Sequence, residues 1–190
     1  AKAGVTTGEW ADALRRVFGQ YRAPTGLAKI ARLSNDPGIV AVRDEVAALS
    51  ARLGRPLTFL VAKPGLDGHS NGAEQIATRA REVGMNALYD GIRFTPAEIA
   101  EQAAKSGAHV VGLSILSGSH VALAEAVLAE LRQRGLDLPV VAGGIIPPED
   151  AARLKAAGIA AVYTPKDFEL TGIMRGVVAI AAQAAGDKAA

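Results

Sequence analysis

Short apolar runs alternate with longer stretches of mixed polarity along the chain after residue 55. The short runs predict β-strands, whereas the apolar residues of the longer stretches recur every three or four positions and predict helices. Strands are expected near residues 57–62, 86–90, 109–113, 139–142 and 160–163, and helices near residues 72–83, 96–106, 119–134, 148–157 and 168–185. The pattern therefore predicts five successive βα units.

The composition of the strands predicts a parallel sheet. Val110–Leu113 and Val140–Ala142 are apolar without alternation, which is typical of strands buried on both faces. Within the βα units, a glycine follows each of the first four predicted helices, as expected at helix C-termini: Gly84, Gly107, Gly135 and Gly158. We expect an α/β domain of the flavodoxin-like (Rossmann-like) type, with five parallel strands in the order 2-1-3-4-5 and helices on both faces. Such sheets bind ligands beyond the carboxyl ends of the strands, at the switch between strands 1 and 3.

The first residues of the chain predict a separate amphipathic helix. Thr6 and Glu9 have the spacing of a capping box. Large apolar side chains then recur on one face: Trp10, Leu14, Val17, Phe18 and Tyr21. This face packs either on the main domain or on a partner, and the pattern leaves both arrangements open.

A second helix lies between this segment and the βα units. Asp36 and Pro37 predict its N-cap and first turn, and Gly54 predicts its end. We divide the chain into a helical N-terminal extension at residues 1–26, a linker and helix at residues 27–54, and the main domain at residues 55–190.

The first βα loop contains the strongest candidate chemistry. It carries three glycines and a proline together with Asp67 and His69, a composition suited to backbone that passes close to a ligand. A carboxylate that accepts a hydrogen bond from one ring nitrogen of a histidine orients the other nitrogen toward a metal. Lys63, four residues before Asp67, would favour the ionised carboxylate. A polar surface turn whose histidine caps a helix explains the same residues, so both interpretations stay open at this point.

Three later loops are expected on the same rim of the sheet. The hydroxyl of Ser114 can bond a buried nitrogen of a ligand, Leu116 can contact its apolar part, and Gly143–Gly144 leave room for a bulky group. The last loop contributes Tyr163 and Thr164. Each feature taken singly is as well explained by an ordinary βα turn, but their shared position favours a binding site.

Composition excludes several classes of function. Hydrophobic residues make up 49% of the chain, yet no apolar run approaches the length of a membrane span, and the N-terminus lacks the pattern of a signal peptide, so a cytoplasmic location is expected. The absence of cysteine excludes disulfides and thiolate metal sites. Aromatic residues are only 4%, and no lysine or arginine cluster is present, which argues against nucleic-acid binding.

Three motifs in order resemble the signature of cobalamin-binding domains. They are Asp67-Gly-His69-Ser-Asn-Gly72, Ser114-Ile-Leu116 and Gly143-Gly144, within a similarity that covers about Arg55 to Val178. Lys63-Pro-Gly-Leu-Asp67 is similar to the acyl-CoA mutase branch of the methylmalonyl-CoA mutase family. The stretches Ala62–Gln75 and Val162–Phe168 are most similar to the ethylmalonyl-CoA mutases. Tyr21–Gly26 resembles the segment that closes the substrate domain of these mutases.

The resemblance implies a cofactor, a ligand set and a missing partner. It implies adenosylcobalamin bound with its own base displaced (base-off), with His69 as the lower axial ligand of cobalt, tuned by Lys63 and Asp67. The residues implied to contact the cofactor are Asp67, Gly68, His69, Ser70, Asn71, Gly72, Ile76, Ser114, Leu116, Gly118, Gly143, Gly144, Tyr163 and Thr164. The chain would be the C-terminal cofactor domain of an isomerase whose acyl-CoA is bound by a separate barrel, so we expect it to be inactive alone. A homo-oligomer is left open.

Two rival functions share the expected fold. A stand-alone cobalamin carrier, sensor or corrinoid methyl-transfer module would have a helical bundle before the domain, whereas residues 1–54 predict only two helices. A phospho-receiver domain would need acidic residues at the ends of strands 1 and 3, where this sequence has Ala62 and Ser114.

The remaining polar candidates are expected to be structural. His109 opens a buried strand, and His120 begins a helix, where we expect it to be exposed to solvent. Asp167, after Lys166, is expected to cap the last helix. Five glutamates are expected on solvated helix faces: Glu74, Glu98, Glu101, Glu125 and Glu130.

Overall fold

The computed structural model describes residues 4–19 and 34–187. Its helices are α1 (Thr7–Phe18), α2 (Pro37–Leu53), α3 (Asn71–Glu82), α4 (Pro96–Ser106), α5 (His120–Gln133), α6 (Pro148–Ala157) and α7 (Leu170–Asp187). Its strands are β1 (Thr58–Ala62), β2 (Asn86–Leu88), β3 (Val110–Ser114), β4 (Val140–Gly143) and β5 (Ala161–Tyr163). The predicted succession of βα units is confirmed.

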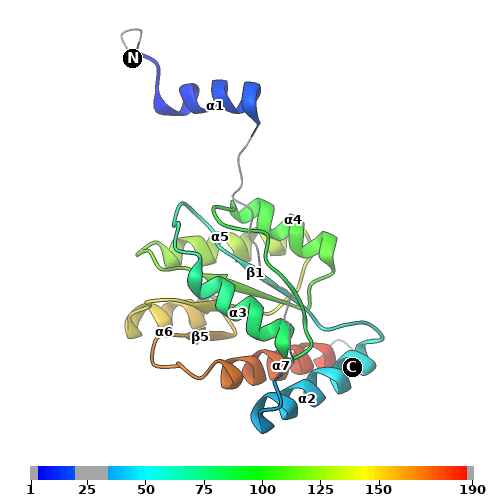
Figure 1. Cartoon of the computed structure of the whole chain (residues 1–190). Coiled ribbons are helices and arrows are strands. Elements are labelled where there is room, and N and C mark those ends of the chain that lie inside the picture. Colours follow the sequence, from blue (N-terminus) through cyan, green and yellow to red (C-terminus); the bar gives the residue numbers. More distant parts are fainter. Residues whose placement is uncertain (1–3, 20–33, 188–190) are drawn as a thin grey trace.

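The five strands form one parallel sheet in the predicted order β2-β1-β3-β4-β5. Side chains of β1 alternate between the two faces: Phe59 and Val61 join a core with α2, α3 and α7, whereas Leu60 and Ala62 join a core with α4, α5 and α6. Figure 1 shows these two layers of helices around the sheet. The flavodoxin-like prediction is therefore confirmed, and all strands end at a common rim.

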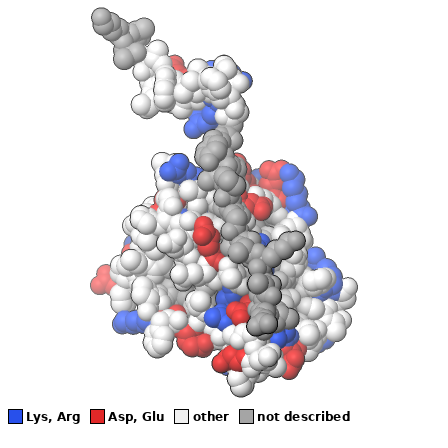
Figure 2. Space-filling model, viewed as in Figure 1, with Lys and Arg blue, Asp and Glu red and all other residues white. Residues whose placement is uncertain are grey.

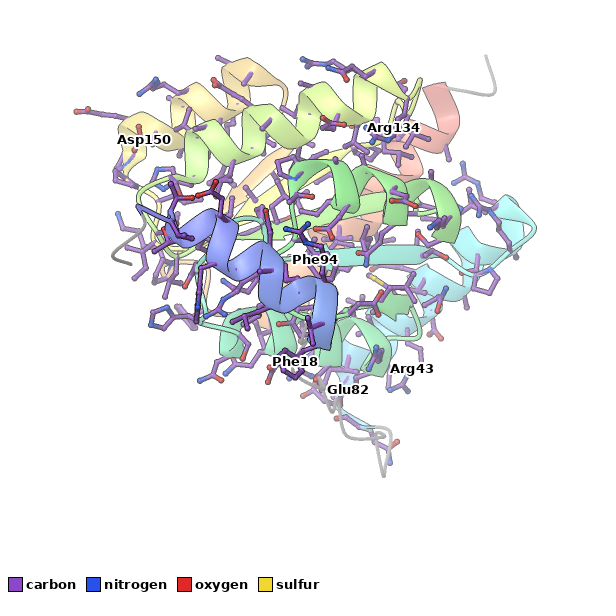
Figure 3. All side chains as sticks on the ribbon, turned by 90° about the horizontal axis from the view of Figure 1, so that it is seen from above. Phe18, Arg43, Glu82, Phe94, Arg134 and Asp150 are labelled. Carbon is purple, nitrogen blue, oxygen red and sulfur yellow. The ribbon has the colours of Figure 1, made fainter. Side chains whose placement is uncertain are left out.

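The helix boundaries follow local hydrogen bonding. Asp36 caps α2 by accepting from the N–H groups of Gly38 and Ile39. Arg43 of α2 donates to the carbonyl oxygen of Glu82 at the end of α3, where Figure 3 labels both residues. These contacts attach α2 to the main domain at a helix terminus whose carbonyl groups lack intrahelical partners.

The start of the last helix differs from the prediction. Asp167 does not cap α7, because its Oδ2 accepts hydrogen bonds from the N–H and hydroxyl of Thr164 and closes a separate turn. Glu169 instead accepts from the N–H groups of Thr171 and Gly172. The helix therefore begins at Leu170 rather than at residue 168. β2 is also shorter than predicted, ending at Leu88.

The first helix has the predicted capping box between Thr6 and Glu9, but it buries none of its residues. Trp10 is 62% exposed and Phe18 is 79% exposed, so its aromatic face does not pack on the main domain. Tyr21 and the segment through Gly26 lie outside the described residues. In Figure 1, α1 stands apart from the sheet.

The surface carries charges of both signs. Figure 2 shows lysine, arginine, aspartate and glutamate side chains interspersed on the face in view, without a large patch of one sign. No helix within residues 4–19 and 34–187 combines the length and apolar character that crossing a membrane requires.

Candidate cofactor site

Lys63 and Asp67 form a buried ion pair at the carboxyl end of β1. The Nζ atom of Lys63, which is fully buried, lies 2.9 Å from Oδ2 of Asp67 and 3.2 Å from the carbonyl oxygen of Ser114. The same Oδ2 accepts the N–H of Leu116 at 3.1 Å. One carboxylate oxygen therefore links the β1–α3 loop to the β3–α5 loop.

The other oxygen of Asp67 holds His69. Oδ1 accepts the backbone N–H of His69 at 3.0 Å and lies 2.7 Å from its ring Nδ1. Burial alone would raise the pKa of Asp67, but hydrogen bonds from the His69 backbone, Lys63, the His69 ring and Leu116 together hold that pKa well below its usual range. The carboxylate is thus a fixed negative charge that orients the imidazole.

The His69 ring points away from the protein. Its side chain is 76% exposed, whereas Asp67 is 5% exposed. In the neutral tautomer that carries its proton on Nδ1, that nitrogen donates to the carboxylate. The lone pair of Nε2 then points to solvent, where it can bind a metal. The described part of the chain has no group of three or more metal-binding side chains. His69 is therefore suited to a metal that brings most of its own ligands.

An apolar cavity of about 210 Å³ opens at the rim of the sheet. Strands β1, β3, β4 and β5 and helices α3 and α7 line it. Eight of the predicted cofactor residues are in its lining: Gly72, Ile76, Ser114, Leu116, Gly143, Gly144, Tyr163 and Thr164. The other six are outside the lining, on the β1–α3 loop, at the start of α3 and on the β3–α5 loop: Asp67, Gly68, His69, Ser70, Asn71 and Gly118. The loops that bear the three motifs therefore meet at one end of the sheet.

Sequence patterns missed much of the lining. The inner wall is formed by strand residues and by one face of α7: Phe59, Val61, Gly112, Val141, Leu170, Ile173 and Val177. Gln75, Ile145 and Pro165 also line the cavity near the loops and were not predicted as site residues. The spacing of Leu170, Ile173 and Val177 shows that they share a helix face, but a core-facing stripe has the same spacing. Only the tertiary structure distinguishes the two.

Gly143, the last residue of β4, and Gly144, which follows it, are glycines for different physical reasons. A Cβ on Gly143 would make only ordinary contacts, 3.8 Å from the carbonyl oxygen of Tyr163, and Gly143 faces the cavity. A Cβ on Gly144 would collide with the carbonyl oxygen of Ile115. Gly144 also lines the cavity, and the absence of a side chain there lets the backbones of two loops approach each other.

The other two histidines are structural. His109 accepts the N–H of Thr58 at its Nδ1, as expected of a residue that opens a strand. His120 is only 3% exposed, so the prediction that it faces solvent is wrong. Its Nδ1 lies 3.1 Å from the Ser117 carbonyl oxygen and its Nε2 lies 2.8 Å from Asp150. His120 thereby joins the start of α5 to the start of α6, where Figure 3 labels Asp150.

Comparisons with known proteins agree with this geometry. An ethylmalonyl-CoA mutase of Cereibacter sphaeroides is 64% identical over 180 residues, which cover 95% of this chain and 28% of that enzyme. An ethylmalonyl-CoA mutase of Methylorubrum extorquens is 56% identical, over 100% of this chain and 28% of that enzyme. The chain thus spans less than a third of the length of these curated relatives.

A solved structure and a family model complete the comparison. The crystal structure of a cobalamin-binding protein from Desulfitobacterium hafniense matches with a TM-score of 0.52 and 20% identity, over 80% of this chain and 69% of that one. At this identity the likeness shows the fold alone. The family model described as the B12 binding domain matches residues 57–169, which contain every loop of the site. The chain belongs to the family of B12 binding domains.

Proposed function

We propose that this chain binds cobalamin in the base-off form, with Nε2 of His69 as the lower axial ligand of cobalt. The observation that carries the proposal is the exposed His69 ring, fixed at Nδ1 by a buried carboxylate beside an apolar cavity. One histidine suffices because the corrin ring supplies the equatorial ligands.

The cavity fits the displaced base. A benzimidazole is flat and mainly apolar, and the lining is apolar apart from a few hydroxyl and amide groups. The Ser114 hydroxyl is placed to bond a ring nitrogen, and Gly143 leaves one wall open. The base would thus exchange its place on cobalt for burial in the protein.

Asp67 and Lys63 act on cobalt through His69. The negative carboxylate fixes the direction of the imidazole, and the Lys63 cation keeps Asp67 ionised and in place. Both are positioning residues, since neither is proposed to touch the cofactor's metal.

The similarity to longer mutases suggests which enzyme this domain belongs to. We propose that the chain is the cofactor domain of an acyl-CoA mutase of the ethylmalonyl-CoA type, in which adenosylcobalamin supplies a radical by cobalt–carbon homolysis. Residues 55–190 would hold the cofactor, and the aromatic face of α1 would pack on a separate barrel that binds the acyl-CoA. This chain alone would show no turnover of ethylmalonyl-CoA, because radical rearrangement needs a dry cavity around the substrate, which one open sheet that covers only the lower face of the cofactor would not supply.

Absorption spectra of the chain mixed with cobalamin test the axial ligand. We expect wild-type protein to give the base-displaced spectrum and His69→Ala to bind weakly without it. The cobalt(II) form with ¹⁵N-histidine should show an altered superhyperfine pattern in electron paramagnetic resonance, since the axial nitrogen then belongs to the protein. Lys105→Ala, on an exposed face of α4, is the control.

The outcomes separate the parts of the proposal. An unchanged cobalamin spectrum in His69→Ala would refute the axial assignment. Failure of the wild-type chain to bind any cobalamin would refute the function. Asp67→Asn should weaken cobalamin binding by roughly 10- to 100-fold, as the loss of an orienting partner does. An unchanged affinity would mean that Asp67 only stabilises the turn and does not orient His69 for binding.

A further inference from the structure

Arg93 adopts a backbone conformation that arginine avoids. Its φ is 67°, and it is the only residue other than glycine with positive φ in the described ranges 4–19 and 34–187. The left-handed region brings Cβ close to the following carbonyl oxygen, so glycine is favoured there. A side chain retained at such a position indicates either a use for that side chain or a constraint from its neighbours.

The neighbours explain the backbone but not the side chain. Phe94, labelled in Figure 3, is 3% exposed, and its N–H donates to the carbonyl oxygen of Lys63 at 3.1 Å. The N–H of Gly65 donates in turn to the carbonyl oxygen of Phe94 at 3.0 Å. These bonds attach the β2–α4 loop to the loop that carries His69 and fix the bend at Arg93. Glycine would allow the same bend.

The Arg93 side chain extends over the His69 loop. A guanidinium nitrogen, Nη2, lies 3.8 Å from the place that a Cβ on Gly68 would occupy. Gly68 immediately precedes His69 in the chain. Arg93 is exposed, and no hydrogen bond or ion pair to its side chain is found among the residues that the structure describes. Its five donors are therefore available beside Gly68, the residue before His69.

The strand order places Arg93 away from the cavity. Arg93 follows β2, which pairs with β1 on the side opposite to β3. The cavity is lined by β1, β3, β4 and β5 and by none of the β2–α4 loop. A contact made by Arg93 would therefore involve the ring held at His69 and not the tail.

We propose that Arg93 is a second anchor for the cofactor, donating hydrogen bonds to amide carbonyl oxygens at the edge of the corrin ring. This inference rests on the proposed function. The planar guanidinium can donate two parallel hydrogen bonds to neighbouring acceptors, which a lysine in its place could not do. Together with His69 it would fix the rotation of the ring about the cobalt–nitrogen axis.

Arg93→Gly separates the side chain from the backbone. Because glycine accepts the observed φ, the variant should fold with an unchanged or higher melting temperature. Its affinity for cobalamin should be roughly tenfold lower, the effect of losing hydrogen bonds to a charged donor. Arg93→Asn, a residue that also tolerates positive φ, should show the same loss.

A second corrinoid locates the contact. Cobinamide has the corrin ring without the nucleotide tail, so Arg93→Gly should weaken binding of cobinamide and cobalamin by the same factor. Gly143→Val, which alters the cavity, should weaken binding of cobalamin only. Titrations followed by absorbance, on wild type and on both variants, give the affinity of each protein for each corrinoid.

Each outcome decides between proposals. If Arg93→Gly and Arg93→Asn bind both corrinoids as wild type does, Arg93 is not an anchor, and the proposed function still stands. A loss confined to cobalamin would place Arg93 at the tail and also overturn the inference. If the wild-type chain binds neither corrinoid, the proposed function fails first.

Discussion

Nζ of Lys63 lies 2.9 Å from Oδ2 of Asp67, and both side chains are buried while the His69 that they support is exposed. Removing one partner of a buried pair leaves an uncompensated charge. Lys63→Met should therefore lower the free energy of unfolding by about 3 kcal/mol. The double variant Lys63→Met/Asp67→Asn should lose less free energy of unfolding, measured by urea titration, than the sum of the losses in the two single variants. An additive result would mean that the pair is not coupled.

Substitutions of the two glycines at the end of β4, Gly143 and Gly144, should separate effects on binding from effects on folding. Gly143→Val should weaken cobalamin binding roughly tenfold or more with little change in melting temperature, because its side chain enters the cavity. Gly144→Ala should destabilise the fold, because the new Cβ meets the carbonyl oxygen of Ile115. Thermal melts and titrations on both variants check this, and equal effects would contradict it.

Tyr89 should make the domain sensitive to high pH. Burial, with a smaller contribution from the charge of Glu74, raises the pKa of Tyr89 from 10.0 to about 12. The folded state thus favours the neutral phenol, so this contribution to stability is fully present below pH 10 and is lost as pH rises toward 12. Tyr89→Phe should lose less stability across that interval than wild type, as measured by urea unfolding at several pH values. Parallel curves would show that Tyr89 does not contribute.

His120 should matter for stability rather than for cofactor chemistry. Both of its partners are acceptors, so both bonds form together only when both ring nitrogens carry protons. His120→Ala should lower the free energy of unfolding by about 2 kcal/mol, since a buried hydrogen bond to a charged group is lost. Asp150→Asn should cost less, because the amide oxygen still accepts. Absorbance titrations should show that cobalamin affinity per folded molecule is nearly unchanged in both.

The aromatic face of α1 should drive self-association of the chain at high concentration. Its side chains at Trp10, Val17 and Phe18 are more than half exposed. Phe18→Glu should reduce the concentration dependence of the sedimentation coefficient. Val5→Glu, which adds the same charge at another exposed residue before the helix, is the control. Equal behaviour of the two variants would mean that the aromatic face is not the contact.

Hydrophobic periodicity predicted the sheet because the central strands β1, β3 and β4 are buried on both faces, whereas the helices packed on the sheet bury one face. The order of the strands then brought the loops that follow β1, β3, β4 and β5 to one rim, so the site could be located before any distance was known. The motif residues Asp67 and His69 were identified from the composition of the loop after the first strand and from its resemblance to the cobalamin-binding signature. Their spacing of two residues lets one carboxylate hold both the backbone and the ring of the histidine.

Two of the features that sequence patterns missed depend on contacts between distant segments. His120 is buried because Asp150, thirty residues later, lies against it. Gly144 is required by the carbonyl group of Ile115 on a neighbouring loop. Ile115 and Asp150 lie outside the helical or strand period from which the elements were predicted. Asp167 differs, because its partner Thr164 is only three residues away and the carboxylate closes a local turn instead of capping the helix.

The loop linkages at the rim have a consequence for the thermodynamics of binding. Asp67 joins the β1–α3 loop to Leu116, and Phe94 joins the β2–α4 loop to Lys63 and Gly65, through hydrogen bonds within the protein. Because these bonds hold the three loops to one another, a rigid macrocycle could bind with little loss of backbone entropy. Association should then be limited by displacement of the cofactor's own base rather than by closure of the protein around it.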